Sequence, residues 1–143
     1  MLYGIQASLK VFLQEQTGLN AVWIYDGVKL PTEKPFITIE HIQNQTNVLD
    51  KMREVAQSIL RFQVGIYAKS NAQMNQLVDD VKTKLIFNQI PMVNTSQPDD
   101  PPVGFFVCRV ERETRIPSDD LTAESDYHRA YLDVSVTANL YKE

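Results

Sequence analysis

The side chains best able to do chemistry in this sequence are three groups of carboxylates, each in a stretch without a helix or strand pattern. Carboxylate oxygens are the ligands that Ca²⁺ prefers. None of the groups has EF-hand spacing, and adjacent acids beside prolines are typical of solvated turns. The sequence therefore favours polar surface loops over a metal site. The three groups are Asp99 with Asp100, Asp119 with Asp120, and Glu124 with Asp126.

The histidines and the single cysteine offer little for catalysis. His41 and His128 lie in opposite halves of the chain, each within a strand-like pattern, where one polar contact is the usual role. Cys108 lies in the apolar run GFFVCRV, which is typical of a small core residue. The phosphate-binding, zinc-protease and serine-hydrolase motifs are absent. We therefore expect no catalytic residue, metal or cofactor, and a protein that is not an enzyme.

The net charge of −4 is unevenly distributed. Residues 1–72 carry seven basic and six acidic side chains, whereas residues 73–143 carry seven and twelve. Nucleic-acid binding normally needs a basic stripe, and the acidic half would repel a phosphate backbone. No apolar run approaches the roughly 18 residues of a membrane span, and the N-terminus lacks a signal-peptide pattern. We expect an intracellular protein without membrane contact.

The elements that must position these residues begin with a helix. An apolar stripe at helical spacing predicts it over residues 4–17, and Gly18 can end it. Residues 20–27 and 35–42 are predicted strands, separated by the proline-flanked loop LPTEKP. The polar stretch 43–53, QNQTNVLDKMR, is predicted to be an extended loop or a long hairpin tip.

A strand and a capped helix follow. The alternation ILRFQVGI predicts a strand with one apolar face from Leu60 to Ile66. The stretch SNAQ matches a capping box, in which Ser70 accepts from the Gln73 amide and Gln73 reaches back to the Ser70 amide. The helix is predicted to extend to about Phe87 with its apolar side inward.

The last third of the chain is predicted to contain two loops and two strands. The prolines and acids of 94–104 and 116–126 predict loops. Residues 103–115 are predicted to be a strand that begins buried and ends charged, and 127–141 a long alternating strand. The whole chain, 1–143, is thus expected to be a single α+β domain. Its antiparallel or mixed sheet would carry two helices on one face and long polar loops.

Function is expected to reside in the loops and strand edges, because long structureless loops in small domains are usually functional or disordered. The loops concerned are 43–53, 94–102 and 116–126. Their candidate residues are Gln43, Asn44, Lys51, Asp99, Asp100, Asp119, Asp120 and Glu124, and the candidate exposed aromatics of the last strand are Tyr131 and Tyr141.

The order of elements resembles the tail terminator, or tail-to-head joining, proteins of long-tailed bacteriophages and prophages. The resemblance covers nearly the whole chain. It rests on the helix IQASLKVFLQEQTG, the segment VWIYDG followed by LPTEKPFITIEHI, the strand SILRFQVGIYAKS with its helix NAQMNQLVDDVKTKL, and the closing strand RAYLDVSVTANLY.

This resemblance implies a homo-oligomeric ring, commonly a hexamer, on the head-proximal end of the tail tube. Such a ring stops tube polymerisation and offers a docking surface to the head connector or head-completion protein, while DNA passes through without specific binding. The protein would be assembled in the bacterial cytoplasm and reside in the neck of the virion, with no cofactor. The resemblance further suggests that Asp119, Asp120 and Glu124 face the lumen, where like charge disfavours phosphate adsorption.

Three other functions remain open from the sequence. The first is another neck component, such as a head-completion or minor capsid protein. The second is a small-ligand-binding or catalytic α+β domain that uses His41 or His128. The third is a sheet protein that binds RNA, whose affinity would fall steeply as salt rises.

Overall fold

The computed structural model describes all residues except 1, 26, 50, 54, 117–127 and 142–143. The described residues form two α-helices and seven strands. The elements are α1 (Leu2–Thr17), β1 (Asn20–Trp23), β2 (Phe36–Val48), β3 (Val55–Tyr67), α2 (Asn71–Phe87), β4 (Ile90–Met92), β5 (Gly104–Phe106), β6 (Arg109–Ile116) and β7 (Arg129–Tyr141).

Five of the strands form one mixed sheet in the order β1-β2-β3-β7-β6. Strand β1 runs parallel to β2, and the other three pairs are antiparallel. Strands β4 and β5 form a separate two-stranded antiparallel ribbon. The predicted α+β class with a mixed sheet is thereby confirmed.

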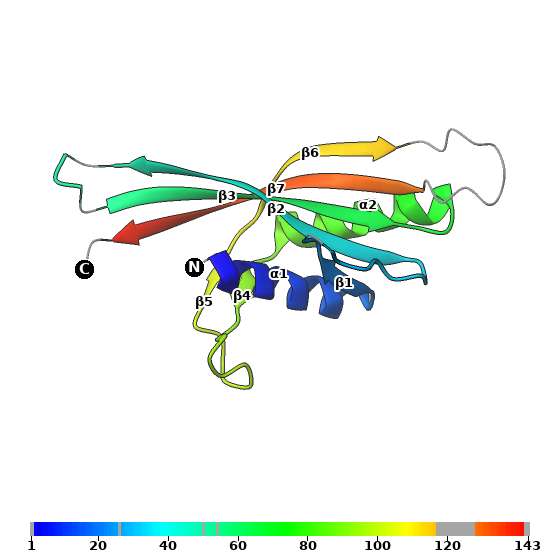
Figure 1. Cartoon of the computed structure of the whole chain (residues 1–143), viewed down its shortest axis with the longest axis horizontal. Helices are drawn as coiled ribbons and strands as arrows, with labels where there is room; N and C mark the ends of the chain where they lie inside the picture. The colour runs from blue at the N-terminus through cyan, green and yellow to red at the C-terminus, as the bar shows by residue number, and fades with distance from the viewer. Residues whose placement is uncertain (1, 26, 50, 54, 117–127, 142–143) are drawn as a thin grey trace.

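Both helices lie on the same side of the sheet (Figure 1). Helix α1 packs against β1, β2 and the ribbon strand β4, whereas α2 packs against β3, β6 and β7. Each helix and each central strand contributes its predicted apolar face to one continuous core. The core residues include Ile5, Leu9, Leu13, Ile37, Ile39, Leu60, Phe62, Val64, Ile66, Val78, Val81, Leu85, Leu132, Val134 and Val136.

The start of α2 follows the predicted capping box with one difference. The Ser70 hydroxyl accepts a hydrogen bond from the Gln73 N–H at 3.1 Å, as expected. The Gln73 side chain, however, accepts from the Lys69 N–H at 2.7 Å rather than from the Ser70 amide. Two backbone donors near the helix start are therefore satisfied by the local sequence alone.

The far end of the sheet extends beyond both helices as a three-stranded projection (Figure 1). We call it the arm, and it comprises residues 43–48 of β2, 55–60 of β3 and 136–141 of β7. Register pairs continue to the end of the arm, from Val48 with Ala56 to Val55 with Tyr141.

Of the two alternatives predicted for residues 43–53, the extended loop is wrong, and the hairpin is right, although its tip is shorter than predicted. Gln43 and Asn44 do not lie in a loop, because they pair with Arg61 and Leu60 as part of β2. The sequence NQTNV shows no apolar alternation, and its strand conformation comes from pairing with β3 rather than from its own pattern. Only the tip of this hairpin is a turn, and it contains Lys51 as predicted.

The segment 103–115 is also divided differently from the prediction. Residues 104–106 form β5 and pair with β4, whereas 109–116 form β6 and pair with β7. The chain changes its partner strand from β4 to β7 at Val107 and Cys108. The Val107 side chain is exposed, and the Cys108 side chain is buried. Strand β1 is shorter than the predicted 20–27, because it ends at Trp23.

Candidate functional site

The arm has two strand edges without a partner among the residues that the structure describes. Strand β1 pairs only with residues 36–39 of β2, and β6 reaches only as far as Ser135 of β7. The outer edges of 43–48 and 136–141 therefore have no partner strand within the described chain, and we call them open. Since β2 and β7 are both antiparallel to β3, these two edges run in the same direction. Unpaired strand edges are ready sites for adding a strand from another chain.

The turn that joins β2 to β3 at the end of the arm, which we call the tip and which has the described residues 49 and 51–53, presents apolar and basic side chains to solvent. Met52 is 74% exposed and Leu49 54% exposed. Lys51 and Arg53 flank Met52 and are exposed as well. Arg53 adopts a φ of 56°, a left-handed conformation that is uncommon for a residue other than glycine. The tip is thus an unusual turn with a methionine at its end.

The base of the arm is marked by two β-bulges that border the same cross-strand pair. Phe62 pairs with Val134. The bulge in β2 follows the pair His41–Phe62, and the bulge in β6 follows the pair Val110–Val134. Bulges increase the local twist and re-aim the strand beyond them. A hollow of about 460 Å³ lies here, lined by Ile42, Gln43, Arg61, Phe62, Gln63, Glu111, Arg112, Asp133 and Val134.

The charges around this hollow are mixed and weakly paired. Arg61 lies 4.0 Å from Glu111 and donates to Gln45 at 3.3 Å. Gln63 donates to Asp133 at 3.4 Å. These side chains are partly exposed, so each contact contributes little, of order 0–1 kcal/mol. Two arginines and two carboxylates line the hollow together, so its composition favours neither an anion nor a cation.

The predicted loop 94–102 is held in an ordered conformation beside the ribbon of β4 and β5. The Asn94 side chain accepts from the N–H groups of Ser96 and Gln97 at 3.1 and 3.2 Å. The Asp100 N–H donates to the Gln97 carbonyl at 3.0 Å. Asp99 and Asp100 are both exposed on this loop, as predicted.

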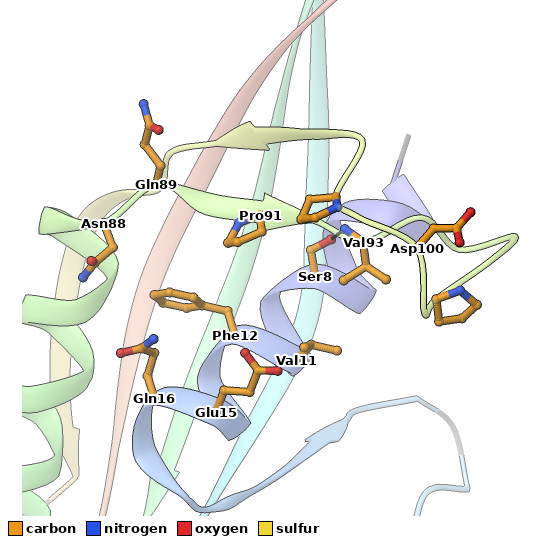
Figure 2. A pocket seen from close by; sticks show the side chains of 12 residues that line it. Ser8, Val11, Phe12, Glu15, Gln16, Asn88, Gln89, Pro91, Val93 and Asp100 are labelled. Carbon is orange, nitrogen blue, oxygen red and sulfur yellow. Dashed lines mark hydrogen bonds between the residues drawn. The ribbon is translucent and has the colours of Figure 1, made fainter.

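A groove of about 380 Å³ separates this loop from α1 (Figure 2). The apolar part of its lining comes from Val11 and Phe12 of the helix and from Pro91 of β4. Glu15 lines the groove from the helix and Asp100 from the loop, and the Asp100 carboxylate points away from α1 (Figure 2). The remaining lining residues are Ser8, Gln16, Asn88, Gln89, Val93, Pro98 and Pro102.

The two candidate tyrosines have different outcomes. The expectation that Tyr131 is exposed is wrong, because its side chain is half-buried against Tyr67 on the uncovered face of the sheet. Tyr141 lies in β7 opposite Val55, and the structure describes its backbone but not its side chain. Asp119, Asp120 and Glu124 fall in 117–127, outside the described residues.

The two histidines do not meet. His41 pairs with Phe62, and its Nε2 lies 2.7 Å from Asn44 Oδ1. The His128 carbonyl accepts from the Ala68 N–H at 2.8 Å. Phe62 in β3 and Ala68, just after the end of β3, are six positions apart, which is roughly 20 Å along an extended chain. The His41 side chain therefore has the polar contact expected of a strand histidine, whereas the contact of His128 is made by its backbone, and His128 lies just before β7 rather than within a strand.

Within the described part of the chain, no three His, Cys, Asp or Glu side chains come together in a way that could hold a metal ion. Neither described helix is long and apolar enough to cross a membrane. Sequence reasoning missed the strand pairing of residues 43–48, because they lack apolar alternation, and it missed the groove, because the groove joins segments more than 70 residues apart. Neither a known protein family nor a curated protein matches this chain.

Proposed function

We propose that this chain is a structural virion protein that caps the head-proximal end of a phage tail tube as a ring and provides the docking surface for the head connector. The proposal joins the resemblance in the order of elements to one structural observation. That observation is the arm, whose two outer edges are open and run in the same direction.

The direction of the edges fits a ring. When the β2 edge of one copy meets the β7 edge of the next, the two strands can lie side by side and share main-chain hydrogen bonds. The two edges are different surfaces, so the contact is heterologous, and a heterologous contact closes into a ring when the rotation between copies allows. The expected partners are further copies of this chain, the tail tube protein and the head connector.

The acidic residues have a role in the same proposal. Asp119, Asp120 and Glu124 would face the lumen, where negative charge lets DNA pass without adsorbing. Asp99 and Asp100 would lie at an interface with a neighbouring copy, the tube or the connector. The proposed location is the neck of the virion, after assembly in the bacterial cytoplasm, and the protein would carry out no reaction.

The test is assembly on tail tubes. Sedimentation velocity over a wide range of concentrations, with and without tubes from the phage or prophage that carries the gene, measures the size of the assembly. Negative-stain images then show whether the species is a ring and whether it sits at one tube end. We expect rings at one end and tubes that no longer elongate. Binding to heads instead of tubes would favour another neck component, and binding to neither would contradict the proposal.

A further inference from the structure

We infer that the groove between α1 and loop 94–102 is the receptor for the arm tip of a neighbouring copy of this chain. The inference rests on the proposed ring but joins the copies by a different contact. Edge-to-edge pairing of the arms would place neighbouring tips side by side, away from the grooves, so the tip–groove contact is the alternative to that pairing. It pairs the most exposed apolar side chain of the tip, Met52, with the groove between α1 and loop 94–102.

The groove is preformed rather than created by a partner. The buried Ser8 hydroxyl donates to the Gly4 carbonyl at 2.6 Å and accepts from the Val93 N–H at 2.9 Å. This bridge fixes the end of β4 against α1. On the other side, the Val103 N–H donates to the Met92 carbonyl at 2.9 Å and closes the ribbon. Little conformational entropy is lost when a ligand enters a site that is already ordered.

The lining of the groove specifies an apolar ligand with positive charge beside it. Val11, Phe12 and Pro91 can contact an unbranched apolar side chain. Glu15 lines the groove from the helix and Asp100 from the loop, where the Asp100 carboxylate points outward in Figure 2, and no lysine or arginine lines the groove in the described chain. A methionine between two basic residues matches this arrangement, since methionine adapts to irregular surfaces.

The arm tip has that composition. Met52 lies between Lys51 and Arg53, and all three are exposed. Asp50 and Glu54 flank these residues in the sequence, so the tip as a whole is not strongly basic. Burial of Met52 would therefore supply most of the affinity, and the two cations would orient the tip between Glu15 and Asp100.

A neighbouring copy, rather than the same chain, must supply the tip. The arm points away from the helices, and its tip lies at one end of the molecule, well apart from the ribbon and loop 94–102 (Figure 1). The three paired strands of the arm cannot fold back without losing their register. The contact is therefore head-to-tail, and each copy offers one tip and one groove.

Directed cross-linking tests this contact. We would prepare Met52→Cys and Val11→Cys separately and treat them with a short bis-maleimide under ring-forming conditions. Cys108 is buried, so it gives little background reaction. The mixture of the two variants should yield covalent dimers, and each variant alone should not. A double variant should yield a ladder of covalent oligomers that ends at the number of copies in the ring.

Charge exchange provides a second readout. Lys51→Glu with Arg53→Glu should weaken self-association at least tenfold, and so should Glu15→Lys with Asp100→Lys. Mixing the two reversed proteins should restore association, because the tip of one then matches the groove of the other. Asp79→Lys on the exposed side of α2 is the matched control and should have no effect.

The outcomes separate this inference from the proposed function. Rings on tubes without cross-links and without a charge effect would overturn the tip–groove contact and leave the ring proposal intact. Cross-links between copies without tube binding would support the contact and contradict the proposed function. Cross-links from Val11→Cys to the tube protein alone would assign the groove to that partner and overturn the inference, as would a strict monomer with tubes present.

Discussion

The hydroxyl oxygens of Tyr67 and Tyr131 lie 3.2 Å apart across β3 and β7, and the two rings meet edge to face with centroids 6.3 Å apart. Tyr67 also stacks on Phe36 at 4.6 Å. These three aromatics lie at the end of the sheet face that neither described helix covers. The hydrogen bond and the ring contacts explain why Tyr131 is half-buried there.

The contact between Tyr67 and Tyr131 predicts that the free energy of unfolding falls at high pH. Burial, together with the hydrogen bond and the charge of Tyr131, raises the pKa of Tyr67 to about 12, and Arg129 opposes the shift. The folded state thus holds the phenol proton more tightly than the unfolded state, whose pKa is near 10. The contribution is fully present below pH 10 and is lost as the pH rises through about 12. Denaturant titrations from pH 8 to pH 12 measure it.

Tyr67→Phe provides the comparison for that pH dependence. Below pH 10 the variant should lose about 0.5–1.5 kcal/mol of unfolding free energy, the usual value of one hydrogen bond. Between pH 10 and 12 the wild-type protein should lose more stability than the variant. Burial also raises the pKa of Cys108 to about 12, but that contribution is common to both proteins. If the free energy of unfolding falls with pH in the same way in both proteins, the loss of stability at high pH does not come from Tyr67.

Gly65→Ala should destabilise the fold by steric overlap. A Cβ at this position would overlap Thr38 Oγ1 and approach the rings of Tyr67 and Tyr131 to 3.2 Å. Thr38 is buried and cannot move away freely. We expect a loss of about 1–3 kcal/mol in chemical denaturation, as for other overpacked sites. Gly104→Ala is the control, because nothing lies within 4 Å of its added Cβ.

Ser70→Ala should weaken the start of α2. The Ser70 hydroxyl satisfies the Gln73 N–H, which would otherwise have no partner in the first turn. The expected cost is about 1 kcal/mol of unfolding free energy, measured by urea titration. Ser70→Asp should retain most of the stability, because aspartate is also a good N-cap. Equal losses in the two variants would show that the cap contributes little.

Thr46→Pro should block assembly without unfolding the chain. The Leu49 N–H donates to the Val55 carbonyl, so alternation along β2 directs the Thr46 N–H toward the open edge and the Gln45 N–H toward β3. Proline is tolerated where the lost N–H faces solvent. We expect normal circular dichroism and thermal unfolding for the variant, but no rings on tail tubes.

Gln45→Pro is the matched control for that experiment. It removes an N–H that is bonded to β3, and we expect it to cost about 1–3 kcal/mol. Thr46→Val tests the side chain alone, because the Thr46 hydroxyl lies 3.3 Å from that of Ser58. Full assembly by Thr46→Pro would rule out the β2 edge as an interface.

Local sequence patterns predicted the elements that bury a face. The alternation from Leu60 to Ile66, the stripe in residues 4–17 and the cap at Ser70 all correspond to the structure, because each signal lies within a few neighbouring residues. The alternation of the last strand, residues 127–141, likewise matches β7 and its buried residues.

The features that sequence reasoning missed depend on distant partners. Residues 43–48 are polar on both faces, so only pairing with β3 makes them a strand. The run 103–115 contains no strong breaker near Val107, and its division reflects two different partner strands. The groove beside α1 combines side chains from the first helix and from loop 94–102, and no local pattern encodes that meeting.

The two bulges beside Phe62 and Val134 have a mechanical consequence. The two described helices pack against one half of the sheet, whereas the arm extends beyond them and is held only where it joins that half. Any small rotation at this root is amplified along the arm into a larger displacement of Met52. The stiffness of that root, more than the chemistry of the tip, would then set how much variation in spacing a neighbouring subunit can accommodate.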